Sequence, residues 1–393
     1  MAYPKVLVQP SAERRVRAGV PWVFSNQIQM DEVKGLAPGS VVRVVLPKGE
    51  TLGLAHFNPH SLISLRLLTR DRAGAIDRAF FVNRLKRALR LRARFFDHPY
   101  YRLVHAEGDF LPGLVIDRFG GIVVVQANTA GMDACTTTIA EALDEVIGPD
   151  TLVLRNDSPM RELEGLSSDV RCLRGSIDGP ITLNENGVRY LADVTGGQKT
   201  GWYYDQRANR ALIGPLCRDQ HVLDVYAYSG SFGLLAARYG AARVTCIDRS
   251  APALALLDEA AKLNDLAGRI ETRCEDAFTA LGAMVDRKDK AGVVLLDPPS
   301  FVKSKRELAQ GLRAYRKLVR LGAPLVSDGG FLAISSCAHN VDDDAFAGEV
   351  RRGLRDAGRA GRLVHRGGAG VDHPLHPALP ETAYLKFHLY ALD

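Results

Sequence analysis

Two segments of the sequence place a reactive group directly after a short apolar run. Asp297 follows Val293–Leu296 and precedes two prolines, and Cys337 closely follows the run Phe331–Ser335. Apolar runs of this length are typical of buried strands, and the prolines restrict the loop that begins at Asp297. Ligands of parallel α/β sheets bind beyond the carboxyl ends of the strands. We therefore expect Asp297 and Cys337 to converge on one bound group.

A thiol and a carboxyl group together suit addition to a cytosine ring, whose C5 is a poor nucleophile. A thiolate that attacks C6 makes C5 enamine-like, and protonation at N3 assists the attack. The hypothesis is that Cys337 attacks C6 while Asp297 hydrogen-bonds N3. C5 then takes a methyl group, and loss of the C5 proton expels the thiol. The alternative interpretation of Cys337 is a buried apolar residue of the core.

An exocyclic amino group is a different target, and its methylation needs no cysteine. Such chemistry typically uses Asp/Asn-Pro-Pro followed by an aromatic ring that stacks on the flipped base. Here Ser300 follows the prolines and Phe301 comes one residue later. This spacing disfavours an amino target but leaves guanine N2 open.

An earlier strand-like run, Val222–Val225, contains Asp224 and leads into a turn with Gly230 and Gly233. Tyr228 stands where the dinucleotide fingerprint G-x-G-x-x-G has its first glycine, so NAD does not fit. A carboxylate at a strand end repels phosphate but suits a cationic ligand. S-adenosylmethionine carries an ammonium and a sulfonium. The turn therefore favours S-adenosylmethionine.

Two further aspartates follow the next strand-like runs. Asp248 lies 24 residues after Asp224 and is placed to accept the ribose hydroxyls, and Asp276 is placed to meet the adenine amino group. Each alone could equally be a helix cap or a surface charge. Together, at successive strand ends, they predict an S-adenosylmethionine-dependent methyltransferase.

The elements that must position these residues alternate between strand and helix from about residue 190. Strand-like runs at 222–225, 243–247, 293–296 and 331–335 enclose helical stretches such as Ser231–Tyr239 and Ala251–Asn264. This alternation predicts an α/β fold with a parallel, doubly wound, Rossmann-like sheet.

The first half of the chain has a different pattern. Residues 1 to about 72 contain β-rich runs, such as Val41–Val45 and Leu62–Leu68, and predict a small β-domain. A helix is expected over 77–96, followed by a hairpin of 113–117 with 121–126. Residues 84–94 of this helix carry six cations, which form either a solvated face or a phosphate-contacting surface: Arg84, Lys86, Arg87, Arg90, Arg92 and Arg94.

The composition is compatible with an ordinary globular protein of two or three domains, at 393 residues with 46% hydrophobic and 24% charged. No apolar run approaches the ~20 residues of a membrane span, and residues 1–15 lack a signal-peptide core, so we expect a cytoplasmic protein with no membrane partner. The six cysteines are scattered, which argues against a disulfide framework and a zinc site. A net charge of +6 permits a polyanionic partner.

The motifs resemble the bacterial 5-methylcytosine methyltransferases of large-subunit ribosomal RNA that carry an N-terminal PUA domain. The most specific match is the segment 197–207, GQKTGWYYDQR, supported by 21–25, 38–42, 108–118, 372–374 and 380–386. The resemblance implies a PUA-like RNA-binding domain (1–72), an α+β middle domain (73–189) and a class I methyltransferase domain (190–393).

The same resemblance implies Cys337 as nucleophile and Asp297 as motif IV aspartate. The cofactor-binding set expected for S-adenosylmethionine is Thr200, Gln206, Asp224, Tyr226, Ser229, Gly230, Asp248, Arg249, Asp276, Ala277 and Asp297. The expected partner is large-subunit ribosomal RNA, a homodimer stays an option, and no metal is expected.

Two departures from that family concern the catalytic loops. Ser300 stands where the family often has lysine and where other RNA 5-methylcytosine enzymes have a second cysteine, and Ala338-His339 differs from the small residues expected. Another group, such as a water, would then expel the product. Two alternatives remain open: methylation of another base, guanine N2 among them, and a non-catalytic RNA-binding assembly factor.

Overall fold

The computed structural model describes residues 3–29, 33 and 35–393, so the start of the segment predicted to lack a signal-peptide core lies outside the described residues. The chain divides into two compact units. Unit 1 comprises Met1–Gly179, Asp193–Trp202 and Val371–Pro380, and unit 2 comprises Pro180–Ala192, Tyr203–Gly370 and Glu381–Asp393. The three-domain division at residues 72 and 189 stays a prediction.

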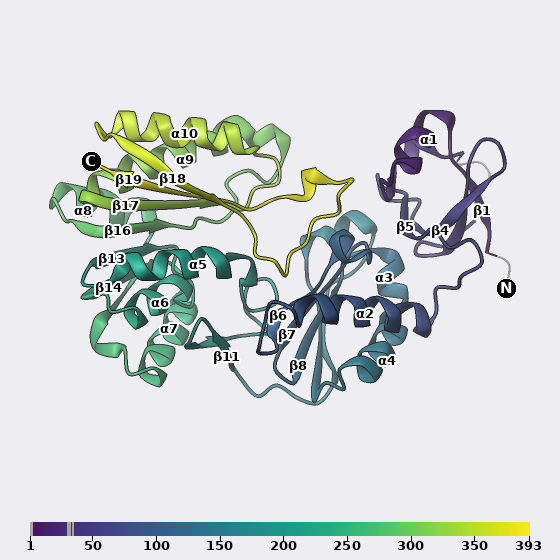
Figure 1. The fold of residues 1–393 in the computed structure, drawn as a ribbon, viewed down its shortest axis with the longest axis horizontal. Coiled ribbons are helices and arrows are strands. Elements are labelled where there is room, and N and C mark those ends of the chain that lie inside the picture. The colour runs from purple at the N-terminus through teal and green to yellow at the C-terminus, as the bar shows by residue number, and fades with distance from the viewer. Residues whose placement is uncertain (1–2, 30–32, 34) are drawn as a thin grey trace. The chain divides into compact units, whose positions relative to one another are not determined.

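Unit 1 contains two β-sheets, each with its own apolar core (Figure 1). Among the described residues the first sheet has the order β1-β3-β4-β5-β2. Its Val- and Leu-rich strands bury alternate or successive side chains, and helix α1 packs on them. The bounds are β1 (Lys5–Leu7), α1 (Pro10–Arg17), β2 (Trp22–Val23), β3 (Val41–Val45), β4 (Thr51–Phe57) and β5 (Leu65–Thr69).

The second sheet of unit 1 has the order β10-β9-β8-β7-β6 within the described part of the chain. The predicted hairpin is confirmed, because β7 and β8 pair antiparallel on either side of Gly120, whose φ is 68°. The bounds are α2 (Arg78–Arg92), β6 (Tyr100–His105), β7 (Leu114–Phe119), β8 (Ile122–Ala127), α3 (Ala130–Ala134), α4 (Thr136–Val146), β9 (Thr151–Asn156) and β10 (Asp169–Arg174).

Helix α2 is shorter than the predicted 77–96. The Asp77 carboxylate accepts the backbone N–H of Phe80 at 2.9 Å and so caps the N-terminus. At the other end the backbone N–H groups of Phe95 and Phe96 both donate to the Arg92 carbonyl, which closes the last turn. Phe96 therefore joins the core from beyond the helix rather than from its face.

Unit 2 is built on a sheet that has, in the described residues, the strand order β15-β14-β13-β16-β17-β19-β18. Its strands are β13 (His221–Val225), β14 (Arg243–Asp248), β15 (Ile270–Cys274), β16 (Ala291–Leu296), β17 (Val326–Ser336), β18 (Gly361–Gly367) and β19 (Lys386–Leu392). A separate hairpin consists of β11 (Ile181–Glu185) and β12 (Val188–Ala192).

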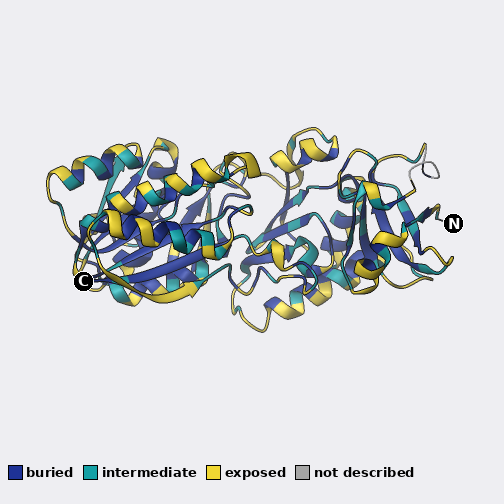
Figure 2. Cartoon of the chain, turned by 90° about the horizontal axis from the view of Figure 1, so that it is seen from above, coloured by how far each residue is buried: buried dark blue, intermediate teal, exposed yellow. Residues whose placement is uncertain are grey.

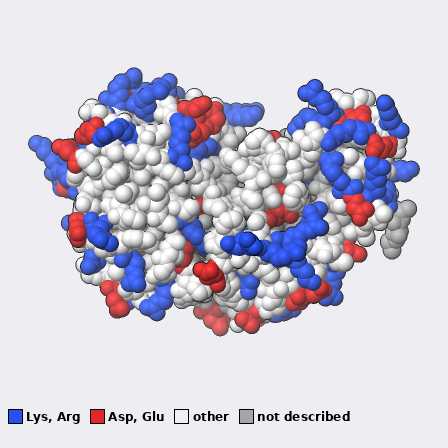
Figure 3. Space-filling model, in the orientation of Figure 1, with Lys and Arg blue, Asp and Glu red and all other residues white. Residues whose placement is uncertain are grey.

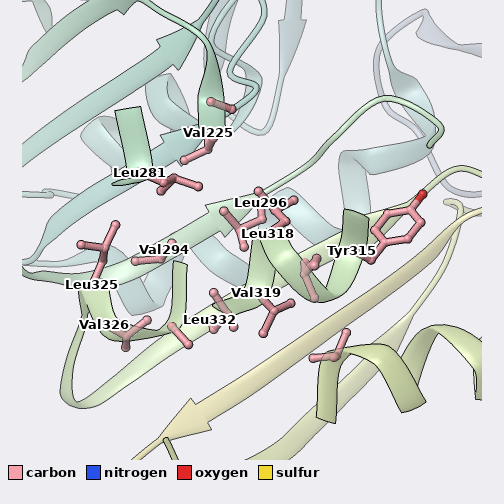
Figure 4. Packing of buried hydrophobic residues seen from close by; sticks show 14 of the residues in the cluster. Val225, Leu281, Val294, Leu296, Tyr315, Leu318, Val319, Leu325, Val326 and Leu332 are labelled. Carbon is pink, nitrogen blue, oxygen red and sulfur yellow. The ribbon is translucent and has the colours of Figure 1, made fainter. Parts of the chain in front are cut away.

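Helices cover both faces of this sheet and confirm the doubly wound architecture (Figures 1 and 2). One face packs against α8, α9 and α10, where Tyr315 lies at the margin of an apolar cluster (Figure 4). The other face packs against α5 and α6, with α7 beside them. The bounds are α5 (Arg207–Ile213), α6 (Ser231–Arg238), α7 (Ala251–Leu263), α8 (Ala277–Asp286), α9 (Leu308–Gly322) and α10 (Asp343–Asp356).

The four strand-like runs predicted from the sequence pair in parallel as β14-β13-β16-β17, which confirms the predicted parallel sheet, and the sheet also contains one antiparallel strand that was not predicted. β19 runs antiparallel to both β17 and β18. A parallel connection needs a long crossover, usually a helix, whereas the chain between β18 and β19 forms only the short 3₁₀ turn Pro380–Thr382.

Within the described residues, no helix has the length and apolar character that would let it cross a membrane.

Candidate active site

The turn after β13 is tightly wound. Tyr226, Tyr228 and Gly230 have φ values of 66°, 48° and 82°, and the first two are strained positions for residues with a side chain. The backbone N–H groups of Tyr226 and Ala227 both donate to the Ile247 carbonyl, at 2.9 and 3.1 Å. Such strain is retained where the surroundings enforce it, often at binding sites.

Asp224 is a buried carboxylate at this turn. Its Oδ2 accepts the Gly233 N–H at 2.8 Å, while Oδ1 has no hydrogen-bond partner among the described residues. Burial raises the pKa of Asp224 to about 7, against the Gly233 hydrogen bond, and the charges of Asp297 and Asp248 raise it further. The Ser229 Oγ is likewise buried and unpartnered in that part of the chain. Buried polar atoms left open in this way indicate a bound group.

Two glycines permit the turn to take this shape. A Cβ on Gly230 would lie 2.4 Å from Leu257 Cγ, and a Cβ on Gly233 would lie 2.5 Å from Cys246 Sγ. A side chain at position 233 would also come within 3.2 Å of the Asp224 carboxylate. Both glycines therefore keep α6 and α7 close to the strand end.

The next two predicted aspartates differ in their surroundings. The Asp248 oxygens accept the backbone N–H groups of Tyr228 at 2.9 Å and Ser250 at 2.8 Å, which fixes the carboxylate between two loops. Asp276 is exposed and accepts the Thr279 N–H at 3.1 Å as the N-cap of α8. The helix-cap interpretation is therefore realised at Asp276.

Asp297 and Cys337 follow adjacent parallel strands, because Leu296 of β16 is in register with Ile334 of β17. Gln206 links the two strand ends: its Nε2 donates to Asp297 Oδ1 at 2.9 Å and to Ser335 Oγ at 3.0 Å. Gln206 was predicted to bind the cofactor, and in the structure its amide donates a hydrogen bond to Asp297.

Three aromatic side chains lie around this pair. Burial raises the pKa of Tyr315 to about 12, and Cys337 and Asp297 both add to the effect. Burial likewise raises the pKa of Tyr203, with contributions from the same two groups. The Phe301 ring lies 4.8 Å from that of Tyr315. Asp297 and Cys337 each raise the pKa of both phenols, so the two groups lie in one environment.

Three contacts at the site were not predicted. Asn209 Nδ2 donates to Gln206 Oε1 at 2.7 Å, Ser336 Oγ donates to the Tyr315 hydroxyl at 2.8 Å, and the Lys386 ammonium donates to the Ala338 carbonyl at 2.7 Å. The spacing of Asn209 three residues after Gln206 is a local signal that could have found it. The other two contacts join segments distant in sequence and carry no local signal.

The remaining predicted residues are placed as follows. Arg249 is exposed after β14, and Ala277 is the buried first residue of α8. Thr200 belongs to unit 1, where its hydroxyl donates to Asp117, so its contact with the cofactor stays a prediction. Within the described residues no cluster of His, Cys, Asp or Glu forms a metal site, and none of the six cysteines forms a disulfide bond.

The cationic side chains in and just after helix α2 differ in burial, and only some of them are exposed. The prediction of a uniform cationic surface was wrong for Arg92, which is buried against Asp109 in a bidentate ion pair. Arg84 is half-buried over the Phe80 and Phe110 rings and donates to the Leu68 carbonyl. The exposed cations of the segment, gathered over α2 in Figure 3, are Lys86, Arg87, Arg90 and Arg94.

Comparison with known proteins identifies the family. A model of PUA-like domains matches residues 6–70, and a model of S-adenosylmethionine-dependent methyltransferases matches residues 165–363. The chain is 35% identical over 388 residues to the ribosomal RNA large subunit methyltransferase I of Alteromonas mediterranea, covering 97% of each protein. It is 35% identical over 389 residues to the protein of that name from Shewanella denitrificans, covering 97% of this chain and 98% of the relative.

Solved structures share the fold over the whole chain. A protein described as a SAM-dependent methyltransferase from Streptococcus mutans superimposes with a TM-score of 0.83 at 21% identity, covering 100% of both chains. A methyltransferase structure complexed with SAH gives a TM-score of 0.84, also at 21% identity and with 100% of both chains covered. The chain therefore belongs to the S-adenosylmethionine-dependent methyltransferase family that includes the ribosomal RNA large subunit methyltransferase I proteins.

Proposed function

We propose that this protein methylates C5 of a cytosine in large-subunit ribosomal RNA, in the cytoplasm, with Cys337 as the nucleophile. The names of its relatives support ribosomal RNA as the substrate. The single observation that carries the cytosine chemistry is the link that Gln206 makes between Asp297 and Ser335, in the strand that ends just before Cys337. A carboxyl group and a thiol on adjacent strand ends are the two groups that addition across C5–C6 requires.

S-adenosylmethionine, when bound, supplies a methyl group on a positively charged sulfur. The Cys337 sulfur forms a bond to C6 of the cytosine, and the electron pair of the C5–C6 double bond becomes available at C5. Asp297, held by Gln206, hydrogen-bonds N3 and stabilises the charge that the attack creates. After C5 is methylated, loss of its proton restores the double bond and breaks the bond between C6 and the Cys337 sulfur.

The residues around the β13 turn fit the cofactor. The open Oδ1 of Asp224 and the open Oγ of Ser229 suit the ammonium and carboxylate of its methionine part. Asp248 accepts one N–H on each oxygen, and a carboxylate has about four acceptor sites, so it retains capacity for ribose hydroxyls. The proposed set at the turn and its neighbours is Tyr226, Ser229, Gly230, Arg249, Asp276 and Ala277, together with Thr200, Gln206 and Asp297.

We also infer that the exposed side of α2 contacts RNA phosphates. Arg87, Arg90 and Arg94 make no side-chain hydrogen bond or ion pair with the described residues, so their charges face solvent. Leu91 and Phe95 are also exposed, at 39% and 57%. Cations interleaved with an exposed ring suit a nucleic-acid backbone with unstacked bases.

The test of the cytosine chemistry combines purified protein, S-adenosylmethionine and unmodified large-subunit ribosomal RNA, followed by nucleoside mass spectrometry. We expect 5-methylcytidine from the wild type and none from Cys337→Ala. The matched control is Cys172→Ala, which removes an exposed thiol in unit 1 and should leave the yield unchanged.

Two results would overturn the proposal. A methylated guanosine or adenosine that Cys337→Ala forms equally well would make Cys337 a core residue and move the target to another base. An absence of cofactor binding at millimolar S-adenosylmethionine would favour a non-catalytic assembly factor.

A further inference from the structure

Lys386 is a buried cation at the start of β19, next to the turn that carries Cys337. Lys386 is 6% exposed. The strand register pairs it with Ser336, the residue before Cys337. Its ammonium donates to the carbonyl of Ala338, the residue after Cys337, at 2.7 Å, and to the carbonyl of Tyr384 at 2.9 Å. Lys386 thus holds the chain on both sides of Cys337.

The charge of Lys386 has no carboxylate in contact with it. Among the described residues it forms no salt bridge, and burying an ammonium without such a partner is costly. Burial lowers the pKa of Lys386, and nearby Asp343, Cys337 and Asp342 partly offset this. A cation that is retained in this position despite its cost indicates a use for its charge.

The two carboxylates near Lys386 already bind other groups. Asp343 Oδ1 lies 2.7 Å from His388 Nε2, and its Oδ2 accepts a hydrogen bond from Arg366 at 3.0 Å. Asp342 caps α10 by accepting the Ala345 N–H at 2.7 Å. Neither carboxylate is therefore dedicated to Lys386. The third ionisable group that raises the pKa of Lys386 is the sulfur of Cys337.

The two phenols and the carboxylate that interact electrostatically with Cys337 would not favour an anionic sulfur. Cys337 and Asp297 both raise the pKa of Tyr203, before α5, and of Tyr315, on α9. A phenol and a carboxyl group are neutral or negative, whereas Lys386 is positive. The thiolate, not the thiol, is the nucleophile, and a neighbouring cation favours it.

We propose that Lys386 is a positioning residue that fixes the Cys337 turn and stabilises the negative charge of the Cys337 sulfur. An ammonium has three N–H groups. In Lys386 two of them donate to the carbonyls of Ala338 and Tyr384, and the third is available to a further acceptor. This inference rests on the proposed function, in which Cys337 attacks the base.

The experiment measures alkylation of Cys337 by iodoacetamide, followed by peptide mass spectrometry across about pH 6 to 10. Lys386→Met keeps the length of the side chain and removes its charge. We expect the pH midpoint of Cys337 alkylation to rise by about one unit, which makes alkylation near neutral pH about tenfold slower. Methylation should fall by a similar factor near neutral pH and recover as the pH rises.

Lys290→Met is the matched control, because the Lys290 ammonium also donates to a backbone carbonyl, that of Pro324, at 2.7 Å. It should leave the alkylation midpoint unchanged. Lys386→Arg keeps the charge and should restore most of the neutral-pH rate. Lys386→Gln keeps an N–H donor without charge and replaces Lys386→Met if that variant fails to fold.

An unchanged alkylation midpoint in a folded, uncharged variant would overturn the proposal and leave Lys386 a purely structural contact. The result is separable from the proposed function. If Cys337→Ala still methylates RNA, Cys337 is not the nucleophile, yet the alkylation profile still reports whether Lys386 acts on its sulfur.

Discussion

Asp117 in β7 and Asp224 in β13 are both buried strand carboxylates, exposed by 0% and 1%, yet their surroundings differ. Arg102 donates to both oxygens of Asp117, at 2.6 and 2.8 Å, and the Thr200 hydroxyl donates to one of them. Asp224 accepts a single backbone N–H from Gly233, and its other oxygen is open within the described residues.

The difference separates a buried charge that is compensated within its unit from one that is not. The carboxylate of Asp117 is compensated inside unit 1, so removing it leaves the buried Arg102 guanidinium without this carboxylate. The carboxylate of Asp224 is not compensated inside unit 2, and its raised pKa reflects that cost. A buried polar atom left open destabilises the free protein and is available to a cationic ligand.

The largest effect is expected when the compensated pair is broken. Asp117→Asn should lower the free energy of unfolding by about 3–5 kcal/mol, because Arg102 stays buried and charged. Thermal and urea unfolding measure this. Asp169→Asn in β10 breaks the exposed pair with Arg171 and should cost less than about 1 kcal/mol. Equal losses in the two variants would remove the distinction between the pairs.

Removal of the uncompensated charge should act in the opposite direction. The pKa of Asp224 is about 7 in the folded protein, against 3.8 for an ordinary aspartate, so the folded protein binds this proton more tightly than the unfolded chain. The carboxylate therefore costs stability as the pH rises from about 4 to 7, by about 4 kcal/mol at most. Asp224→Asn should be more stable than the wild type above pH 7 and equal to it below about pH 4.

The same variant tests the role of Asp224 in binding. Asp224→Asn should weaken S-adenosylmethionine binding by about tenfold or more, since a charge-assisted hydrogen bond contributes about 1.5–3 kcal/mol. Titration calorimetry at about pH 8 measures this. A variant that is less stable and binds the cofactor normally would place Asp224 with Asp117 as a structural charge.

Asp276 sharpens the comparison because its carboxylate is exposed and caps α8. Asp276→Ala should cost about 1 kcal/mol of stability through loss of the cap, whereas Asp276→Asn keeps it. If Asp276 also meets the adenine amino group, both variants should bind S-adenosylmethionine more weakly. Normal binding by both would leave Asp276 a helix cap alone.

The smallest effect on stability is expected at the exposed side of α2. The double charge reversal Arg87→Glu and Arg90→Glu should change stability by less than about 0.5 kcal/mol per site. It should weaken RNA binding and lower the salt slope of the affinity by about two. The control reverses Arg351 and Arg355 on α10, which carry the same charges in unit 2. Unchanged affinity and slope would contradict the proposed RNA contact.

The positions of the candidate site residues at strand ends could be predicted from the sequence. Asp224, Asp248, Asp297 and Cys337 lie at or just after apolar runs that the structure shows as β13, β14, β16 and β17. This succeeded because strand-like runs, glycine turns and prolines are local signals, and because parallel strands present their carboxyl ends on one edge. The hairpin of β7 and β8 was predictable for the same local reason.

Contacts between distant segments were decided only by the tertiary structure. Composition showed a cationic helix over α2 but not that Arg92 lies inside, because the partners that accept it, Asp109 and the Asp372 carbonyl, come from other segments. The antiparallel β19 delivers Lys386 to the Cys337 turn, and its direction follows from a connection without a helix. Gln206 reaches Asp297 across 91 residues. Local patterns determine the type of each element, whereas partners and burial depend on the packing of elements far apart in the chain.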